Sequence, residues 1–227
     1  MFKRPHHQAI GAVLQALDAD LLEQAACFFG GGTAITLLLG EYRESVDIDF
    51  LCASQDGYRL LRNRIIEEIA PIFIRSIQQV GHVRRDQYGI RTRVAIGASI
   101  IKFEIIREAR IPLVGARPGV LGVPTLDPVS LYASKLLANA DRGLDSSTLS
   151  RDAIDLAMMI RAWGAIPVQA WDVARAAYGD HLLTAFSASV TRLQDQGYVA
   201  LCLKGMAMDP AEGPAIAEAL GRQTLPS

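Results

Sequence analysis

Residues 28–50 read FFGGGTAITLLLGEYRESVDIDF, and the rest of the predicted fold is organised around this stretch. A short apolar run enters three consecutive glycines, after which Thr33 opens an apolar segment that Gly40 ends. A polar link then leads into a second apolar run at residues 46–50. Apolar runs of this length, separated by glycines, predict a strand, a glycine turn, a short helix, a loop and a second strand.

Two aspartates lie near the start of the second predicted strand. Strand side chains alternate between faces, so Asp47 and Asp49 are expected on one face. Adjacent carboxylates repel each other unless a cation lies between them. Mg²⁺ takes oxygen ligands and usually keeps substrate phosphate oxygens in its shell. The pair therefore predicts a site for Mg²⁺ or Mn²⁺, although a solvated strand edge would also place two aspartates in this way.

The glycine turn supplies the complementary half of a phosphate site. Amide groups at a helix N-terminus face anions, and Gly31 and Gly32 would let phosphates approach the backbone closely. The hydroxyl of Thr33 can cap the helix or bond a phosphate oxygen. A tight turn with a capped helix explains the glycines and threonine equally well, but their combination with Asp47 and Asp49 favours the functional interpretation.

Length and charge set broad limits on the protein. Its 227 residues can form one large domain or two small ones with a sizeable core. The net charge is −1, but Arg59–Arg117 contains 12 Lys and Arg against 5 Asp and Glu, whereas the chain from Leu121 onward contains 8 against 11. A basic middle suits a phosphate-rich ligand such as a nucleotide or RNA. Arginines scattered on a solvated sheet face would give the same count.

The cysteines and the apolar segments bear on compartment. Cys27, Cys52 and Cys202 lie in apolar surroundings without close spacing, which is typical of core residues in a reducing compartment. No segment approaches the roughly 20 apolar residues of a membrane span. The adjacent His6 and His7 interrupt any signal-peptide core and are expected to face solvent. We therefore expect a cytoplasmic protein without a membrane partner.

The region up to residue 107 is predicted to alternate helices and strands. Helices are predicted at residues 6–24 and 58–70, and strands at 72–80, 88–96 and 99–107. In the last strand, Lys102 and Glu104 share one face, whereas the opposite face is apolar. Glu104 is either half of a surface ion pair on an edge strand or a third carboxylate beside Asp47 and Asp49.

A loop-like link at Gly115–Pro128 contains three prolines and three glycines, and it predicts a domain boundary. The predicted domains are residues 1–120 and 121–227. Helices are predicted in the second domain at residues 128–139, 151–163, 168–178, 181–194 and 210–222, with Ser150 as a cap. The fold class is therefore α+β, with a C-terminal helical bundle.

Two of these helices carry polar stripes. Lys135 lies on the first of them, and Arg151, Asp152 and Asp155 lie on the second at helical spacing. Salt bridges on helix surfaces would explain all four residues without any function. An acid-bearing sheet followed by helices with basic and acidic stripes favours a site that uses both parts.

Four segments resemble the AbiEii/AbiGii-type nucleotidyltransferase toxins, a branch of the polymerase-β-like nucleotidyltransferase superfamily. These segments are residues 28–50, 100–106, 131–142 and 151–159, so the resemblance covers roughly residues 28–160. It implies a polymerase-β-like nucleotidyltransferase core, with a mixed twisted sheet and helices, followed by a helical bundle that completes the nucleotide site.

The resemblance also implies roles for individual residues. The three acids would bind the metal ions, and Lys135 and Asp155 would complete the catalytic site, while the remaining positions would bind the nucleotide: Gly31, Gly32, Thr33, Arg43, Ser45, Arg151 and Asp152. Two positions depart from the superfamily pattern. Thr33 replaces the usual serine of the glycine turn and keeps its hydroxyl, and Glu104 replaces the usual third aspartate.

The implied function is metal-dependent transfer of a nucleotide from an NTP to an acceptor hydroxyl. A toxin of this kind would act on tRNA or other RNA and would belong to a toxin–antitoxin or abortive-infection pair with a cognate antitoxin. The alternatives are a small-molecule nucleotidyltransferase of the aminoglycoside-modifying type and an inactive member of the fold that binds a nucleotide or a partner.

Overall fold

The computed structural model describes residues 2–117 and 119–226, which pack into two units. The first unit holds the chain up to residue 37 together with residues 45–127. The second unit holds residues 38–44 together with the chain from residue 128 onward. The short segment 38–44 therefore packs with the helices that follow much later in the sequence. The units divide after residue 127, and the predicted boundary at 120/121 stays a prediction.

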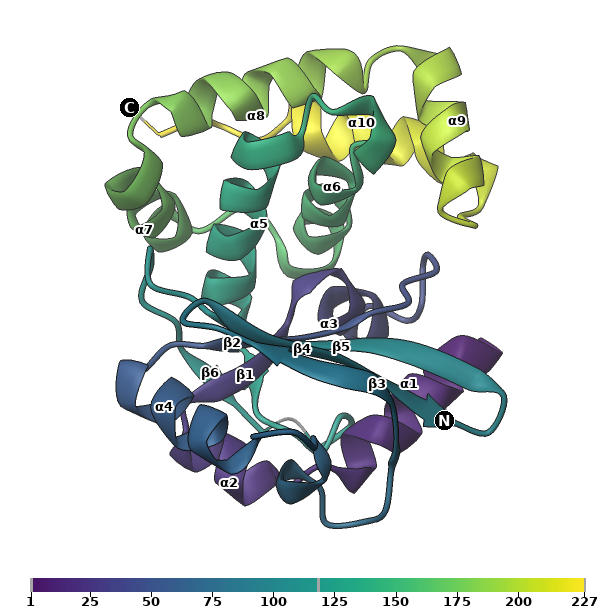
Figure 1. Cartoon of the computed structure of the whole chain (residues 1–227). Helices are drawn as coiled ribbons and strands as arrows, with labels where there is room; N and C mark the ends of the chain where they lie inside the picture. The colour runs from purple at the N-terminus through teal and green to yellow at the C-terminus, as the bar shows by residue number, and fades with distance from the viewer. Residues whose placement is uncertain (1, 118, 227) are drawn as a thin grey trace. The chain divides into compact units, whose positions relative to one another are not determined.

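A seven-stranded sheet forms the first unit, in the order β3-β4-β5-β2-β1-β7-β6 (Figure 1). β2 runs parallel to β5 and β1 runs parallel to β7, whereas the other neighbours are antiparallel. The mixed sheet confirms the predicted α+β class. The strands are β1 (Cys27–Gly30), β2 (Ile48–Cys52), β3 (Gln78–Arg85), β4 (Gly89–Ile96), β5 (Ser99–Arg107), β6 (Gly115–Ala116) and β7 (Thr125–Leu126).

One face of the sheet is apolar and buried. On β5, Ile101, Phe103 and Ile105 are fully buried, as the alternating pattern predicted. The rings of Phe29, Phe50 and Phe103 form a row across β1, β2 and β5, with centroids 5.5 and 5.8 Å apart. Burial of these large side chains drives the packing of the sheet. The opposite face of β5 carries Lys102 and Glu104.

The helices of the first unit are α1 (Pro5–Ala16), α2 (Ala19–Gln24), α3 (Gly31–Leu38) and α4 (Gln55–Arg64). Helices α1, α2 and α4 cover the apolar face of the sheet (Figure 1). The predicted helix over residues 6–24 is wrong in one respect, because it is broken between α1 and α2. Leu17 forms a β-bridge with Phe73 at this break, and the Asp18 carboxylate accepts from the Leu21 amide at 3.0 Å to cap α2.

Two further predicted boundaries in this unit are wrong. The helix predicted at 58–70 begins earlier, with Ser54 as its cap, and ends at Arg64 because Ile65 turns into the core in an extended conformation. The strand predicted at 72–80 lies later in the chain. β3 covers Gln78–Arg85 and passes through Gly81 with a shift of register between Val80 and Arg84.

The second unit is helical. Its helices are α5 (Pro128–Arg142), α6 (Arg151–Trp163), α7 (Val168–Tyr178), α8 (His181–Arg192), α9 (Gln196–Gly205) and α10 (Gly213–Gly221). α5 packs against α6, α7 and α8, and α10 packs against α6 (Figure 1). The predicted helices at 151–163 and 168–178 are confirmed to the residue. Sequence patterns did not predict α9, whose cap Asp195 accepts from the amides of Gly197 and Tyr198.

Among the described residues, no helix combines the length and the apolar character that a membrane crossing requires.

Candidate active site

The glycine turn brings its backbone against Asp49. Gly30 is the register partner of Asp49 across β1 and β2, and α3 begins at the next residue. Gly31 has φ +67°, a conformation that favours glycine. A Cβ atom there would lie 3.0 Å from Asp49 Oδ2 and 3.3 Å from Asp49 Cβ. Glycine thus lets the Asp49 carboxylate lie beside the N-terminus of α3, where backbone amides lack helical partners.

Asp49 and Glu104 lie side by side on neighbouring strands. They are register partners in the parallel pairing of β2 with β5, so their side chains leave the same face of the sheet. Asp47 lies one residue before β2. Burial works to lower the pKa of Lys102, but Glu104, Asp47 and Asp49 together raise that pKa above its usual value. All three carboxylates therefore lie within electrostatic reach of one ammonium group.

Glu104 already has cationic neighbours. It pairs with Lys102 on its own strand, and its Oε1 atom lies 3.1 Å from Nε of Arg91 on β4. The alternative is right about the Lys102–Glu104 ion pair but wrong about the edge position, because β5 is a central strand. Among the described residues, no three Asp, Glu, His or Cys side chains form a ready-made metal cage. The role of Glu104 as third metal ligand stays a prediction.

The chemistry of the donors fits a hard divalent cation. Asp47, Asp49 and Glu104 offer only carboxylate oxygens, which are the ligands that Mg²⁺ and Mn²⁺ prefer. Asp49 also lies against Gly31, where the absence of a Cβ atom leaves space at the N-terminus of α3 that we call the cradle. A metal ion at Asp49 would therefore lie beside backbone amides suited to phosphate oxygens.

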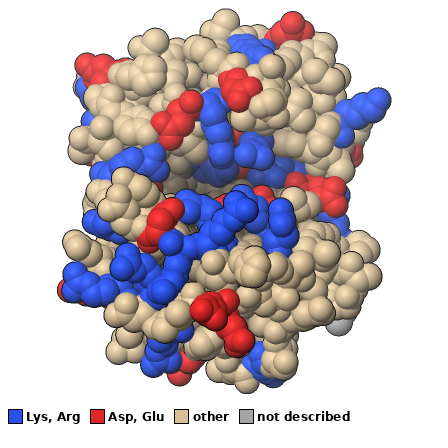
Figure 2. All heavy atoms as spheres, in the orientation of Figure 1, with Lys and Arg blue, Asp and Glu red and all other residues tan. Residues whose placement is uncertain are grey.

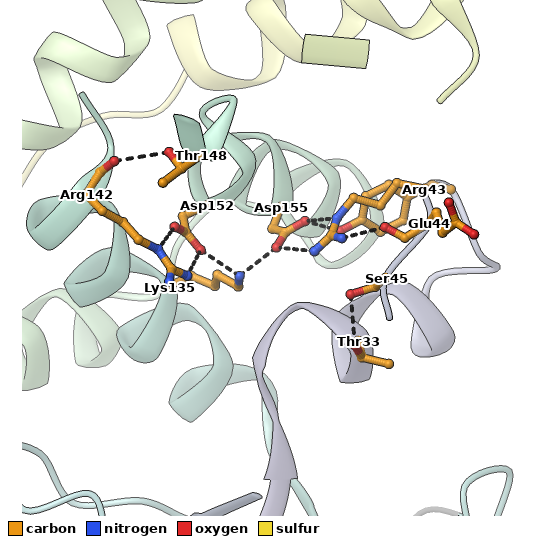
Figure 3. Close-up of polar contacts among 10 residues, drawn as sticks. Thr33, Arg43, Glu44, Ser45, Lys135, Arg142, Thr148, Asp152 and Asp155 are labelled. Carbon is orange, nitrogen blue, oxygen red and sulfur yellow. Dashed lines mark hydrogen bonds and ion pairs between the residues drawn. The ribbon is translucent and has the colours of Figure 1, made fainter. Parts of the chain in front are cut away.

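Thr33 holds the chain that leads to Asp47. The hydroxyl of Thr33 donates to the carbonyl oxygen of Asp47 at 2.6 Å. The same hydroxyl lies 2.8 Å from Oγ of Ser45 (Figure 3). Thr33 is buried, so these bonds are partly shielded from solvent. In this structure the hydroxyls of Thr33 and Ser45 position the acid-bearing segment, and their contact with a nucleotide stays a prediction.

Two histidines at the start of α1 hold the same segment. The amide of Ser45 donates to Nε2 of the fully buried His7 at 3.1 Å, and Nε2 of His6 lies 2.9 Å from the carbonyl oxygen of Val46. The expectation that both histidines face solvent is wrong for His7, which is fully buried, whereas His6 keeps part of its surface exposed. Only an apolar periodicity through His7, continuous with Ile10 and Leu14, could have indicated that it is buried.

A buried ion network occupies the second unit. The Asp155 carboxylate, with no exposed surface, accepts from Nε and Nη2 of Arg43 at 2.7 and 2.9 Å and from the Tyr42 hydroxyl at 2.6 Å. Nζ of Lys135 lies 2.6 Å from Oδ2 of Asp155 (Figure 3). This two-point Arg43 contact anchors segment 38–44 on α6, which explains why that segment packs with the second unit.

Lys135 links this cluster to Asp152. Its Nζ donates to Oδ1 of Asp152 at 2.8 Å, and Arg142 donates from Nε to Oδ2 at 2.7 Å (Figure 3). Burial works to raise the pKa of both aspartates, but Arg43 and Lys135 hold the pKa of Asp155 below its usual value. Lys135 and Arg142 do the same for Asp152. The explanation by surface salt bridges is therefore wrong for these residues.

Arg151 differs from this network because it is exposed at the first position of α6. Ser150 does not cap the helix with its side chain, since its backbone is left-handed and its hydroxyl lies 3.0 Å from that of Tyr198. The predicted site residues thus fall into two sets. Gly31, Gly32, Thr33, Ser45, Asp47, Asp49 and Glu104 belong to the first unit, and Arg43, Lys135, Arg151, Asp152 and Asp155 to the second.

The cradle at Gly31 can be tested by Gly31→Ala. A methyl group there would press on the Asp49 carboxylate and force alanine into a left-handed backbone, which costs about 1 kcal/mol. Gly122→Ala is the matched control, because Gly122 has φ +73° but no atom within 4 Å of an added Cβ. We expect both variants to lose stability, Gly31→Ala somewhat more because of its contact with Asp49, and we expect a loss of nucleotidyl transfer, measured with labelled NTP, in Gly31→Ala alone. Equal transfer by the two variants would contradict the cradle.

A model of the family described as nucleotidyl transferase AbiEii toxin, type IV TA system, matches residues 12–222. A search of the curated proteins gives no match.

Two solved structures from Helicobacter pylori are similar in fold. The protein called JHP933 has a TM-score of 0.57 and 16% identity, with 97% of this chain and 92% of that chain covered. A protein described as a nucleotidyltransferase has a TM-score of 0.56 and 16% identity, with 94% and 93% covered. At this identity the likeness establishes the fold.

Proposed function

Because the chain belongs to the AbiEii family of nucleotidyltransferase toxins, we propose that it transfers a nucleotide from an NTP to a hydroxyl group of RNA, such as tRNA, in a reaction that needs Mg²⁺ or Mn²⁺. Family membership establishes that the protein is a nucleotidyltransferase with a toxin role, and the solved relatives establish its fold. The metal, the acceptor and the roles of individual residues are the proposal.

The observation that carries the proposal is the meeting of Asp49 with the glycine turn and with Glu104. Asp49 lies opposite Gly30, against Gly31 and beside Glu104. Adjacent carboxylates repel one another, and a divalent cation with phosphate oxygens would offset that repulsion beyond what Lys102 and Arg91 supply at Glu104. A helix N-terminus within the same turn suits the phosphates of a nucleotide.

The reaction is an in-line displacement at the α-phosphorus of the NTP. The acceptor hydroxyl loses its proton to water, its oxygen attacks the phosphorus, and the bond to pyrophosphate, the leaving group, breaks. The backbone at Gly31, Gly32 and Thr33 would hold phosphate oxygens, and Asp47, Asp49 and Glu104 would hold the metal. When bound, a divalent ion activates the attacking hydroxyl and neutralises the leaving pyrophosphate. Positioning and electrostatics supply most of the acceleration.

The second unit would contribute cations to the nucleotide site. An ammonium group has three donors, and Lys135 gives two of them to Asp152 and Asp155. The proposal assigns its third donor to a phosphate oxygen. Arg43 and Asp155 would keep Lys135 in place, and Arg151 would offer a further exposed cation to the nucleotide.

The proposal extends to partner and compartment. A toxin of a type IV toxin–antitoxin system implies a cognate antitoxin, and abortive infection is the proposed setting. The three cysteines are unbridged and buried, which supports a reducing compartment such as the cytoplasm.

Acceptor labelling tests this function. Purified protein with Mg²⁺ and each of the four α-labelled NTPs is incubated with total tRNA or, in parallel, with aminoglycosides. We expect metal-dependent labelling of RNA that EDTA abolishes. Labelling of aminoglycosides alone would support a small-molecule enzyme instead. Nucleotide binding by calorimetry without transfer to any acceptor would support an inactive member of the fold.

A further inference from the structure

The polar face of the sheet in the first unit carries a groove with a volume of about 410 Å³. β3, β4 and β5 form its floor and walls, and the register shift between Val80 and Arg84 bends β3 at its edge. A register shift within a strand pair bends the strand locally and changes the direction of its side chains. The groove is therefore a feature of the sheet itself and not of a loose loop.

The groove is strongly basic. Its lining contains four cations, Arg84, Arg91, Arg93 and Lys102, against one carboxylate, Glu104. Figure 2 shows Lys and Arg side chains gathered in a band over these strands. Arg84 and Arg93 are exposed, and within the described part of the chain neither forms an ion pair with a carboxylate. Two of the four cations are thus available to an anionic ligand.

The groove is continuous with the candidate catalytic acids. Arg93 and Lys102 are register partners across β4 and β5, as are Arg91 and Glu104. Glu104 is in turn the register partner of Asp49 on β2. Neighbouring strands lie about 5 Å apart, so the step from Arg91 to Asp49 spans about 10 Å. A ligand lying in the groove would therefore reach the acids at its β5 side.

We propose that this groove, defined by Arg84, Arg91, Arg93 and Lys102, binds the sugar–phosphate backbone of a nucleic-acid strand and directs it toward Asp49. Alternate residues of one strand lie about 7 Å apart, so Arg91 and Arg93 present charges at repeated intervals along β4. Repeated, exposed cations suit a chain of phosphates, in which each contact is sequence-independent. That this nucleic-acid strand is the acceptor rests on the proposed function, whereas the binding of nucleic acid to the groove does not.

Other anions fit the groove less well. A single phosphate is usually held by converging donors, but these cations are spread over three strands. A flat anionic membrane would meet a protruding surface more readily than the floor of a concave groove. A cationic acceptor such as an aminoglycoside would be repelled by the four cations. The observations therefore favour a flexible polyanion.

The inference is tested by the binding of labelled single-stranded RNA and DNA oligomers. We would measure the fluorescence anisotropy of RNA and DNA oligomers of about 12 nucleotides, without NTP or metal, for the wild-type chain and the Arg84→Ala/Arg93→Ala variant. Loss of two phosphate contacts is expected to weaken binding about tenfold at low salt and to reduce the slope of log affinity against log salt by about 1.4. The two oligomers show whether the backbone must be that of RNA.

Matched variants show whether the loss of binding belongs to the groove. Arg59→Ala/Arg64→Ala removes two exposed arginines from α4, outside the groove, and is expected to bind like the wild type. Arg84→Lys/Arg93→Lys keeps the charges and should restore most of the affinity. Equal losses in the groove and α4 variants would overturn the proposal, as would groove-dependent binding to phosphatidylserine vesicles. Failure of the wild-type chain to bind either oligomer would overturn it as well.

These readouts separate the groove from the proposed function. If binding depends on the groove but RNA is never labelled, nucleic-acid binding stands and the RNA-modifying function falls. If RNA is labelled but the groove variant binds and labels like the wild type, the function stands and the groove assignment falls.

Discussion

Replacement of Asp49 by asparagine is expected to lower the rate of nucleotidyl transfer by at least about a thousandfold. Asparagine keeps the size of the side chain beside Gly31 but removes the negative charge. Metal ions stabilise the transition state of phosphoryl transfer by several kcal/mol. Each loss of 1.36 kcal/mol of this stabilisation lowers the rate about tenfold. Single-turnover transfer of label from α-labelled NTP to RNA, at several concentrations of Mg²⁺, measures the change.

A matched control separates charge at the site from charge in general. Asp56→Asn removes a carboxylate from an exposed position on α4, where its neighbour is Arg59 at 3.2 Å. Exposed pairs of this kind contribute less than about 1 kcal/mol, so this variant should be as active and as stable as the wild type. Asp47→Ala is expected to abolish transfer as Asp49→Asn does. Wild-type activity in either acid variant would show that the metal assignment is wrong.

Asp155→Ala is expected to destabilise the second unit by about 3–5 kcal/mol. The substitution leaves Arg43 and Lys135 buried, with side chains 5% and 6% exposed, and without the carboxylate that both contact. An uncompensated buried charge is costly because burial removes its hydration. For a chain of this length the melting temperature should fall by roughly 10 °C, as measured by circular dichroism.

Two comparisons make this prediction specific. Asp172→Ala removes an exposed aspartate from α7 and should change stability by about 0.5 kcal/mol or less. The double variant Arg43→Met/Asp155→Leu replaces both partners by apolar groups and should recover part of the loss. If Asp155→Ala melts like Asp172→Ala, the network does not stabilise the second unit.

The same network predicts how stability depends on pH. The pKa values of Asp152 and Asp155 in the folded protein lie below the ordinary value of 3.8, because cations hold both carboxylates charged. Such groups stabilise the fold above the unfolded pKa and lose that contribution as pH falls through the folded pKa. The difference in unfolding free energy between wild type and Asp155→Ala should be constant above about pH 5 and shrink below pH 3.8. A difference that does not change with pH would contradict it.

The sequence best predicted the elements in which apolar side chains recur at a single helical or strand spacing without interruption. α6 and α7 have the predicted bounds, as does β5, where buried Ile101, Phe103 and Ile105 alternate with Lys102 and Glu104. In each case the local pattern and the tertiary environment require the same conformation.

Predictions failed where a contact distant in sequence decided the conformation. The helix over 6–24 is interrupted because Leu17 pairs with Phe73, and the helix that starts at Gln55 ends early because Ile65 is buried. β3 continues through Gly81 because β4 offers it a partner on both sides of the register shift. Local propensity is a weak guide when a distant strand or core supplies the stabilising energy.

The candidate site divides in the same way. The pattern Asp-Ile-Asp after three glycines indicated that acids and a phosphate cradle occur together. The placement of Glu104 beside Asp49 depends on the pairing of β2 with β5, and the support that His7 gives to Ser45 depends on where α1 packs. Neither contact could be predicted from the spacing of residues in the sequence, because each contact joins residues tens of positions apart.

The sequence by itself determined the α+β class, the glycine turn before Asp47 and Asp49, and the residue types that suit metal and phosphate, since these depend on local period and side-chain chemistry. Only the tertiary structure decided that Arg43 binds Asp155, 112 residues away, and that Arg91 and Lys102 flank Glu104. Pairing of opposite charges depends on distance in space. Chain folding sets that distance through burial of the apolar core, which leaves few arrangements for the polar groups that it encloses.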